Sequence, residues 1–183
     1  MKKIELYADG LNPNEFNDDF GIEIDGYTFN PSLFKKNNAK NYLNYSKSIL
    51  EKSKNKPVSL EVFADDEDSM IKQAKILSKL SSNVYVKIPI TFTNKNFTTA
   101  VLEELVKENV KLNITALFTI DQVRKILPIL KNTSSILSIF AGSSAPTSWD
   151  FCRKQFLPLT SWVFSPRGSF LSFEGEILLS ASL

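Results

Sequence analysis

The sequence has no histidine and only one cysteine, Cys152, among its 183 residues. A zinc site built from histidine and cysteine ligands, or a nucleophile activated by a histidine, is therefore not expected. A single cysteine cannot form an internal disulfide, which suits the reducing cytoplasm.

Long apolar runs and an excess of one charge are also missing. No run approaches the roughly 20 apolar residues of a membrane-spanning helix, and the N-terminal stretch MKKIELYADG lacks the apolar core of a signal peptide. The 22 basic and 20 acidic residues nearly balance, and the basic residues do not cluster with aromatics. We therefore expect a cytoplasmic protein with no nucleic-acid and no membrane partner.

What the chain does contain is an alternation of two hydrophobic patterns. Short segments rich in β-branched and aromatic residues predict strands at 4–9, 24–30, 57–64, 83–91, 111–118 and 134–142. Segments with helical spacing of apolar residues predict helices at 30–54, 65–82, 96–110 and 119–132. Repeated βα units without a hairpin signal predict a parallel sheet with helices outside it.

An open doubly wound sheet and a (β/α)₈ barrel both fit this alternation. No G-x-G-x-x-G or Walker motif follows a predicted strand, which weakens the nucleotide-binding versions. Polar residues recur at or near the C-terminal ends of the strands, where a barrel brings them to one mouth. They are Asp9, Thr28, Asn30, Glu61, Lys87, Asn113, Thr115 and Ser138. These positions favour the (β/α)₈ barrel.

Lys87 interrupts the most apolar of the predicted strands, NVYVKIPIT at 83–91. Burying an ammonium group is costly unless it loses its proton or gains a counter-charge. One interpretation is a lysine whose stem reaches to solvent at the strand end. The other is a chemical role for its amine.

The composition changes near residue 143. From there on the chain carries both tryptophans, the cysteine and two of the three arginines, and shows no amphipathic helical period. We therefore divide the chain into a barrel portion, 1–142, and an irregular or disordered tail, 143–183. A barrel usually needs about 250 residues, so this one is truncated after about six βα units. The tail is either a divergent extension or a frameshifted segment.

The strand-end residues together resemble the transaldolase family, including its short branch and the fructose-6-phosphate aldolases. The matching motifs are YADGLN, TFNPSL, VSLEV, VYVKIPIT, KLNITALFT and LSIFAG. They lie on six successive predicted strands and cover residues 4–142 in unbroken order. The resemblance implies a (β/α)₈ barrel enzyme of the pentose phosphate pathway, with sugar-phosphate substrates and no metal or organic cofactor.

The resemblance gives Lys87 the role of the Schiff-base lysine of a class I aldolase-type transferase. An amine must be neutral to attack a ketone, whereas a free lysine has a pKa of about 10.4. An apolar barrel interior disfavours the ammonium form and so makes the nucleophile available.

The resemblance also implies roles for three further catalytic residues. Asp9 is the acid and base for the C4 hydroxyl of the substrate, or else an acid that caps a following helix. Glu61 and Thr115 hold a catalytic water. Glu61 can instead be a salt-bridge partner of Lys87, or serve in both ways.

The remaining matched residues are expected to bind substrate. Asn30 and Asn113 would hydrogen-bond the hydroxyls of a dihydroxyacetone unit. Thr28 and Ser138 either line the same cavity or are satisfied polar groups of the barrel. Phe140 stands where the aldolases tend to carry tyrosine, and it favours the transaldolase branch, as Glu61 does.

Residue 143 departs from the family pattern. The resemblance implies an arginine there that binds the substrate phosphate, whereas this chain has Ser143. A serine cannot replace a permanently charged, bidentate phosphate ligand. Three functions stay open: a transaldolase, an aldolase that releases free dihydroxyacetone, and a truncated, non-catalytic barrel. A homo-oligomer is equally open.

Overall fold

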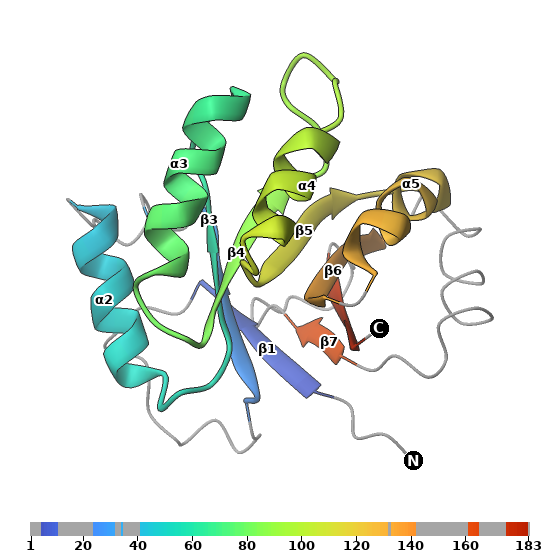
Figure 1. Ribbon diagram of the computed structural model, residues 1–183. Coiled ribbons are helices and arrows are strands. Elements are labelled where there is room, and N and C mark those ends of the chain that lie inside the picture. Colours follow the sequence, from blue (N-terminus) through green and yellow to red (C-terminus); the bar gives the residue numbers. More distant parts are fainter. Residues whose placement is uncertain are drawn as a thin grey trace.

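The computed structural model describes residues 5–10, 24–31, 34, 41–131, 133–141, 161–164 and 175–182 (Figure 1). Six strands follow one another in the sheet in sequence order, and all six are parallel. They are β1 (Glu5–Asp9), β2 (Gly26–Phe29), β3 (Val58–Glu61), β4 (Val84–Pro89), β5 (Leu112–Leu117) and β6 (Ser134–Ala141). The predicted fold class, a (β/α)₈-type barrel truncated after about six units, is confirmed.

Helices connect these strands on the outer side of the curled sheet (Figure 1). They are α2 (Tyr42–Lys52), α3 (Glu67–Ser78), α4 (Thr99–Lys107) and α5 (Ile120–Leu130). Local sequence fixes where α3 and α5 begin: the Asp66 carboxylate accepts from the Ser69 amide, and Thr119 and Gln122 form a capping box. The start of the helix predicted at 30–54 falls mostly on residues outside the described ranges.

The two faces of the strands differ because successive side chains point to opposite sides. On β3 to β5, one set of alternating residues is apolar and packs on the helices. This set comprises Val58, Leu60, Val86, Ile88, Leu112 and Ile114, all buried in the main core with helix residues such as Leu77, Leu105 and Ile126. The intervening residues, Ser59, Glu61, Lys87, Asn113 and Thr115, face the concave side and are mostly polar.

Contacts across the concave side show that the sheet curls. Tyr7 of β1 and Ile136 of β6 are both buried and pack with Tyr85 of β4 in one small cluster. The ring of Tyr7 lies over Gly26, where an added Cβ would come within 2.3 Å of it. Only glycine therefore lets β2 pass this closely under the ring.

Two further strands lie at the edges of the six. β7 (Ser161–Phe164) pairs with β1 in parallel, and β8 (Gly175–Ser182) pairs with β6 in antiparallel fashion. An antiparallel strand is not the product of a βα unit, which returns the chain in the same direction. The rest of the predicted tail, 143–183, lies outside the described residues.

Candidate active site

Lys87 lies between two polar neighbours on the concave face of the sheet. In the parallel register its Cα partners are Glu61 of β3 and Asn113 of β5. The Lys87 side chain is 2% exposed, and its Nζ lies 3.8 Å from Oε2 of Glu61, whose side chain is 17% exposed. The distance describes an ion pair longer than a hydrogen bond. Lys87 therefore does not reach to solvent, and Glu61 is its counter-charge.

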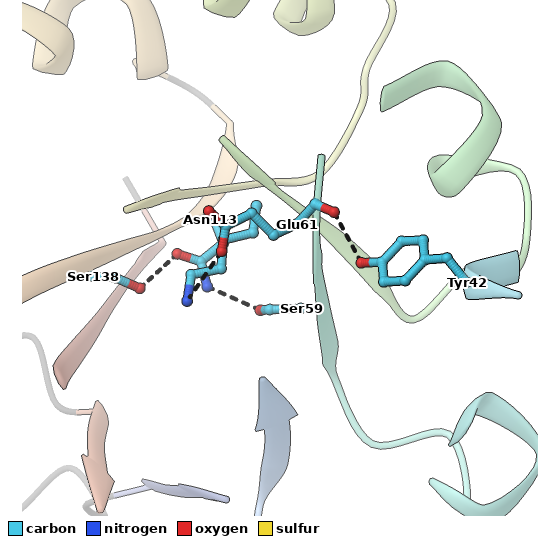
Figure 2. A network of polar contacts seen from close by, with 6 residues as sticks. Tyr42, Ser59, Glu61, Asn113 and Ser138 are labelled. Atoms are coloured by element: carbon cyan, nitrogen blue, oxygen red, sulfur yellow. Dashed lines mark hydrogen bonds and ion pairs between the residues drawn. The ribbon is translucent and has the colours of Figure 1, made fainter. Parts of the chain in front are cut away.

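Asn113 of β5 links β3 and β6 through its side-chain amide (Figure 2). Its Nδ2 donates to the Ser59 hydroxyl at 2.9 Å, and its Oδ1 accepts from the Ser138 hydroxyl at 2.7 Å. All three residues are fully buried. In a flat sheet β3 and β5 would lie about 9.6 Å apart, so the bond to Ser59 depends on the curl of the sheet. The amide is thereby fixed beside Lys87 in one orientation.

Thr115 follows Asn113 on the same face and ends the regular part of β5. It is buried and in register with Pro89 of β4. The pairing with β6 shifts immediately afterwards, and Ala116 has a φ of 58°, in the left-handed region. Bulges of this kind recur next to active sites because they redirect a strand. The strand resumes its pairing at Leu117, opposite Ile139, and then ends.

Asp9 and Thr28 extend the polar face toward β1 and β2. Asp9 is in register with Thr28, and Thr28 is in register with Ser59, so the three share a face. Thr28 is fully buried, and among the described residues its hydroxyl oxygen has no hydrogen-bond partner. Asn30 follows β2 and is half-buried. The structure thus brings seven predicted site residues onto connected positions of one face, and Asn30 follows directly after the end of β2.

The described side chains include neither Phe140, a predicted site residue, nor Ser143, which stands where the family pattern has an arginine. Phe140 lies on β6 opposite Glu176 of β8, but its side chain is outside the described part of the chain. Ser143 lies outside the described residues altogether.

Two residues of this site, Ser59 and Tyr42, were not predicted from the sequence. Ser59 precedes Glu61 by two residues, so the alternation of a strand was a signal that both face the interior. The Tyr42 hydroxyl donates to the backbone carbonyl of Glu61 at 2.8 Å. Burial raises the pKa of Tyr42, and the nearby Glu61 charge acts in the same direction. This hydroxyl is therefore a donor throughout the physiological pH range.

A search of the described residues for a helix long and apolar enough to cross a membrane found none.

Comparison with known proteins identifies the family. The transaldolase/fructose-6-phosphate aldolase family matches residues 6–148, and the chain belongs to it. A probable transaldolase of Methanococcus vannielii is 40% identical over 119 residues, which are 65% of this chain and 51% of that protein. One of Bartonella tribocorum is 31% identical over 140 residues, 76% of this chain and 60% of that protein. The chain therefore spans about half the length of the curated relatives it matches.

Proposed function

We propose that this chain carries the covalent chemistry of a transaldolase, which transfers a dihydroxyacetone unit between sugar phosphates in the pentose phosphate pathway of the cytoplasm. The observation that carries the proposal is the buried Lys87 amine beside the Glu61 carboxylate, at the centre of the polar face of a parallel, barrel-type sheet. A lysine buried in this way is the residue type used for Schiff bases with carbonyl substrates.

The steps follow from the chemistry of the amine. The neutral Lys87 amine attacks C2 of the ketose phosphate, and the carbinolamine loses water to give an iminium. Asp9 takes the proton of the C4 hydroxyl, the C3–C4 bond breaks, and its electron pair moves to the iminium nitrogen as an enamine forms. The shortened aldose phosphate leaves. The enamine then attacks an acceptor aldehyde, Asp9 returns the proton, and water releases the new ketose.

The other residues of the polar face have supporting roles in this scheme. Glu61 and Thr115 hold the water that carries protons while the carbinolamine forms and dehydrates. Asn113 is already oriented by Ser59 and Ser138, and with Asn30 it binds hydroxyls of the dihydroxyacetone unit. The fully buried Thr28 hydroxyl adds hydrogen-bonding capacity to the same face. Phe140 keeps the substrate-binding role that the family resemblance implies.

Two other candidate functions rest on specific residues. An aldolase would protonate the enamine at C3 and release free dihydroxyacetone, and Glu61 and Phe140 disfavour it. A non-catalytic barrel is favoured by Ser143, because the charge that would bind phosphate is absent. Product analysis with and without an acceptor aldehyde separates the two enzymes.

Reductive trapping tests the proposal. After incubation with fructose 6-phosphate and borohydride, peptide mass spectrometry should find the reduced adduct at Lys87, and Lys87→Met should abolish it. Lys111→Met is the matched control, since Lys111 is an exposed lysine at the next strand, and it should leave the adduct unchanged. Label spread over surface lysines and unaffected by Lys87→Met would overturn the Schiff-base assignment.

A further inference from the structure

The pairing of β2 with β3 leaves the Glu61 carbonyl without its ladder donor. The Tyr27 amide donates to the Pro57 carbonyl at 2.8 Å, and Phe29 is in register with Leu60. In a parallel ladder this pattern repeats every two residues on both strands. The next donor, facing the carbonyl of Glu61, would be the amide of residue 31. Residue 31 is proline, which has no N–H.

The Tyr42 hydroxyl donates to the Glu61 carbonyl in place of that amide (Figure 2). It reaches the Glu61 carbonyl at 2.8 Å from the first residue of α2. Its ring is held edge-to-face by Phe34, with ring centroids 5.0 Å apart, and by Phe63, at 4.5 Å. Two aromatic contacts on one ring limit its rotation. The hydroxyl therefore has little freedom to leave the carbonyl.

The bond matters because Glu61 is the last residue of its strand. On the other side of β3, the Val62 amide donates to the Lys87 carbonyl at 3.2 Å. The peptide between Glu61 and Val62 is thus held by β4 through its N–H and by Tyr42 through its C=O. If the carbonyl lost its donor, this peptide could rotate toward water. The Glu61 carboxylate would then move relative to the Lys87 amine.

We propose that Tyr42 is a positioning residue that replaces the N–H missing at Pro31 and thereby holds the Glu61 carboxylate against Lys87. Its importance for turnover rests on the proposed function, but its effect on the charge of Lys87 does not. A nearby carboxylate favours the ammonium form of a lysine. Loss of the Tyr42 hydroxyl should therefore leave more neutral amine at Lys87 at a given pH.

Carbamylation by cyanate measures this effect without any substrate, because cyanate reacts with the neutral amine. The rate at Lys87 is followed by peptide mass spectrometry from pH 6 to 11 in the wild type, Tyr42→Phe, Glu61→Gln and the double variant. Tyr42→Phe should lower the midpoint of the pH profile of Lys87 carbamylation by about half a unit. It should also raise the carbamylation rate of Lys87 at pH 7 about threefold. Glu61→Gln should lower this midpoint by at least as much. Adding Tyr42→Phe to Glu61→Gln should give no further shift, because the carboxylate that Tyr42 positions is already gone.

Tyr45→Phe is the matched control, because Tyr45 lies on the same helix and its ring also packs on Phe34. It should leave the midpoint in place. An unchanged midpoint in Tyr42→Phe, or an equal shift in the wild-type and Glu61→Gln backgrounds, would overturn the positioning role. Phe63 is half-exposed, and Phe63→Leu removes one of the aromatic contacts that hold the Tyr42 ring. This variant should give a smaller shift of the midpoint in the same direction. It replaces Tyr42→Phe as the test if Tyr42→Phe does not fold.

Trapping with fructose 6-phosphate in the same variants separates the two proposals. A midpoint shift without any wild-type adduct would support the positioning role and refute the Schiff-base function. A wild-type adduct without a midpoint shift in Tyr42→Phe would support the Schiff-base function and refute the positioning role.

Discussion

The two faces of β3 to β5 are made by alternate residues of the same strands, yet they differ in almost every physical respect. The outer face is aliphatic and fully covered by helices, as Val86 and Ile88 illustrate. The concave face holds an ion pair and a chain of buried hydrogen bonds centred on Lys87 and Asn113. Burial of apolar area stabilises the sheet from outside, whereas each polar group inside needs a partner to avoid a cost.

The comparison teaches that stability and chemistry are separated by one residue along each strand. A substitution on the outer face should change the free energy of unfolding and leave the reactivity of Lys87 in folded molecules intact. A substitution on the concave face should change the reactivity of Lys87 much more than a substitution on the outer face does.

The largest effect is expected for Ile88→Ala on the outer face. Ile88 is fully buried, so the deletion leaves a cavity and should cost about 2–5 kcal/mol of unfolding free energy. Urea denaturation measures the loss, and borohydride trapping on the folded fraction should be unchanged. The control is Ile76→Ala, a half-exposed position on α3, with an expected change within about 0.5 kcal/mol. Equal losses at both positions would break the comparison.

Asn113→Ala should have the next largest effect, and on both properties. It removes the partner of the buried Ser59 and Ser138 hydroxyls, which should cost about 1–3 kcal/mol. It should also slow trapping at Lys87, since the oriented amide is lost. Ser59→Ala removes one of the two bonds and should cost less in a parallel denaturation series. A larger loss in Ser59→Ala than in Asn113→Ala would mean that the amide does not organise this face.

Glu61→Gln keeps the shape of the side chain and removes its charge. If carboxylate-assisted water chemistry favours transfer, the products should shift toward free dihydroxyacetone, by several-fold relative to transfer. Chromatography of the products with and without an acceptor aldehyde measures the ratio. An unchanged ratio would remove Glu61 as the basis for separating transaldolase from aldolase.

The smallest effect concerns alkaline pH. The pKa of Tyr42 is raised by burial above its ordinary value of 10.0, so above pH 10 the unfolded chain releases this proton while the folded chain keeps it. The stabilisation is complete below pH 10 and is lost as the pH rises further. Tyr42→Phe should be less stable than the wild type by about 0.5–1.5 kcal/mol at pH 8, and the gap should narrow at pH 11. Paired urea titrations test this, and a gap that widens would contradict it.

Much of the barrel portion could be predicted from local pattern. The strand predicted at 83–91 is observed as β4 (Val84–Pro89), and the one at 111–118 as β5 (Leu112–Leu117). Lys87 could be singled out because a charged side chain inside an apolar strand is costly to bury. Six motifs in sequence order then indicated a family whose resemblance implies a chemical role for this lysine.

Other features depend on contacts that sequence does not encode locally. The Tyr42 hydroxyl meets Glu61 only because α2 packs against the end of β3. The direction of β8 is another case: the apolar run GEILLSASL indicates a strand, but only its pairing shows that it runs against β6. Ser59, by contrast, was readable from the alternation V-S-L-E and was overlooked.

The order of strands in the sheet also predicts an order of folding. From β1 to β6 every strand pairs with the one that follows it in the chain, so each pairing closes only a short loop. The pairing of Glu5 with Ser161 joins segments from opposite ends of the chain, and the entropy lost in closing a loop grows with its length. On the ribosome, β1 is made before the other strands, and its second neighbour, β7, is made only after β2 to β6. Until β7 is made, the outer edge of β1 carries unpaired backbone groups. A nascent chain in which another segment pairs with that edge would be kinetically trapped before the sheet is complete.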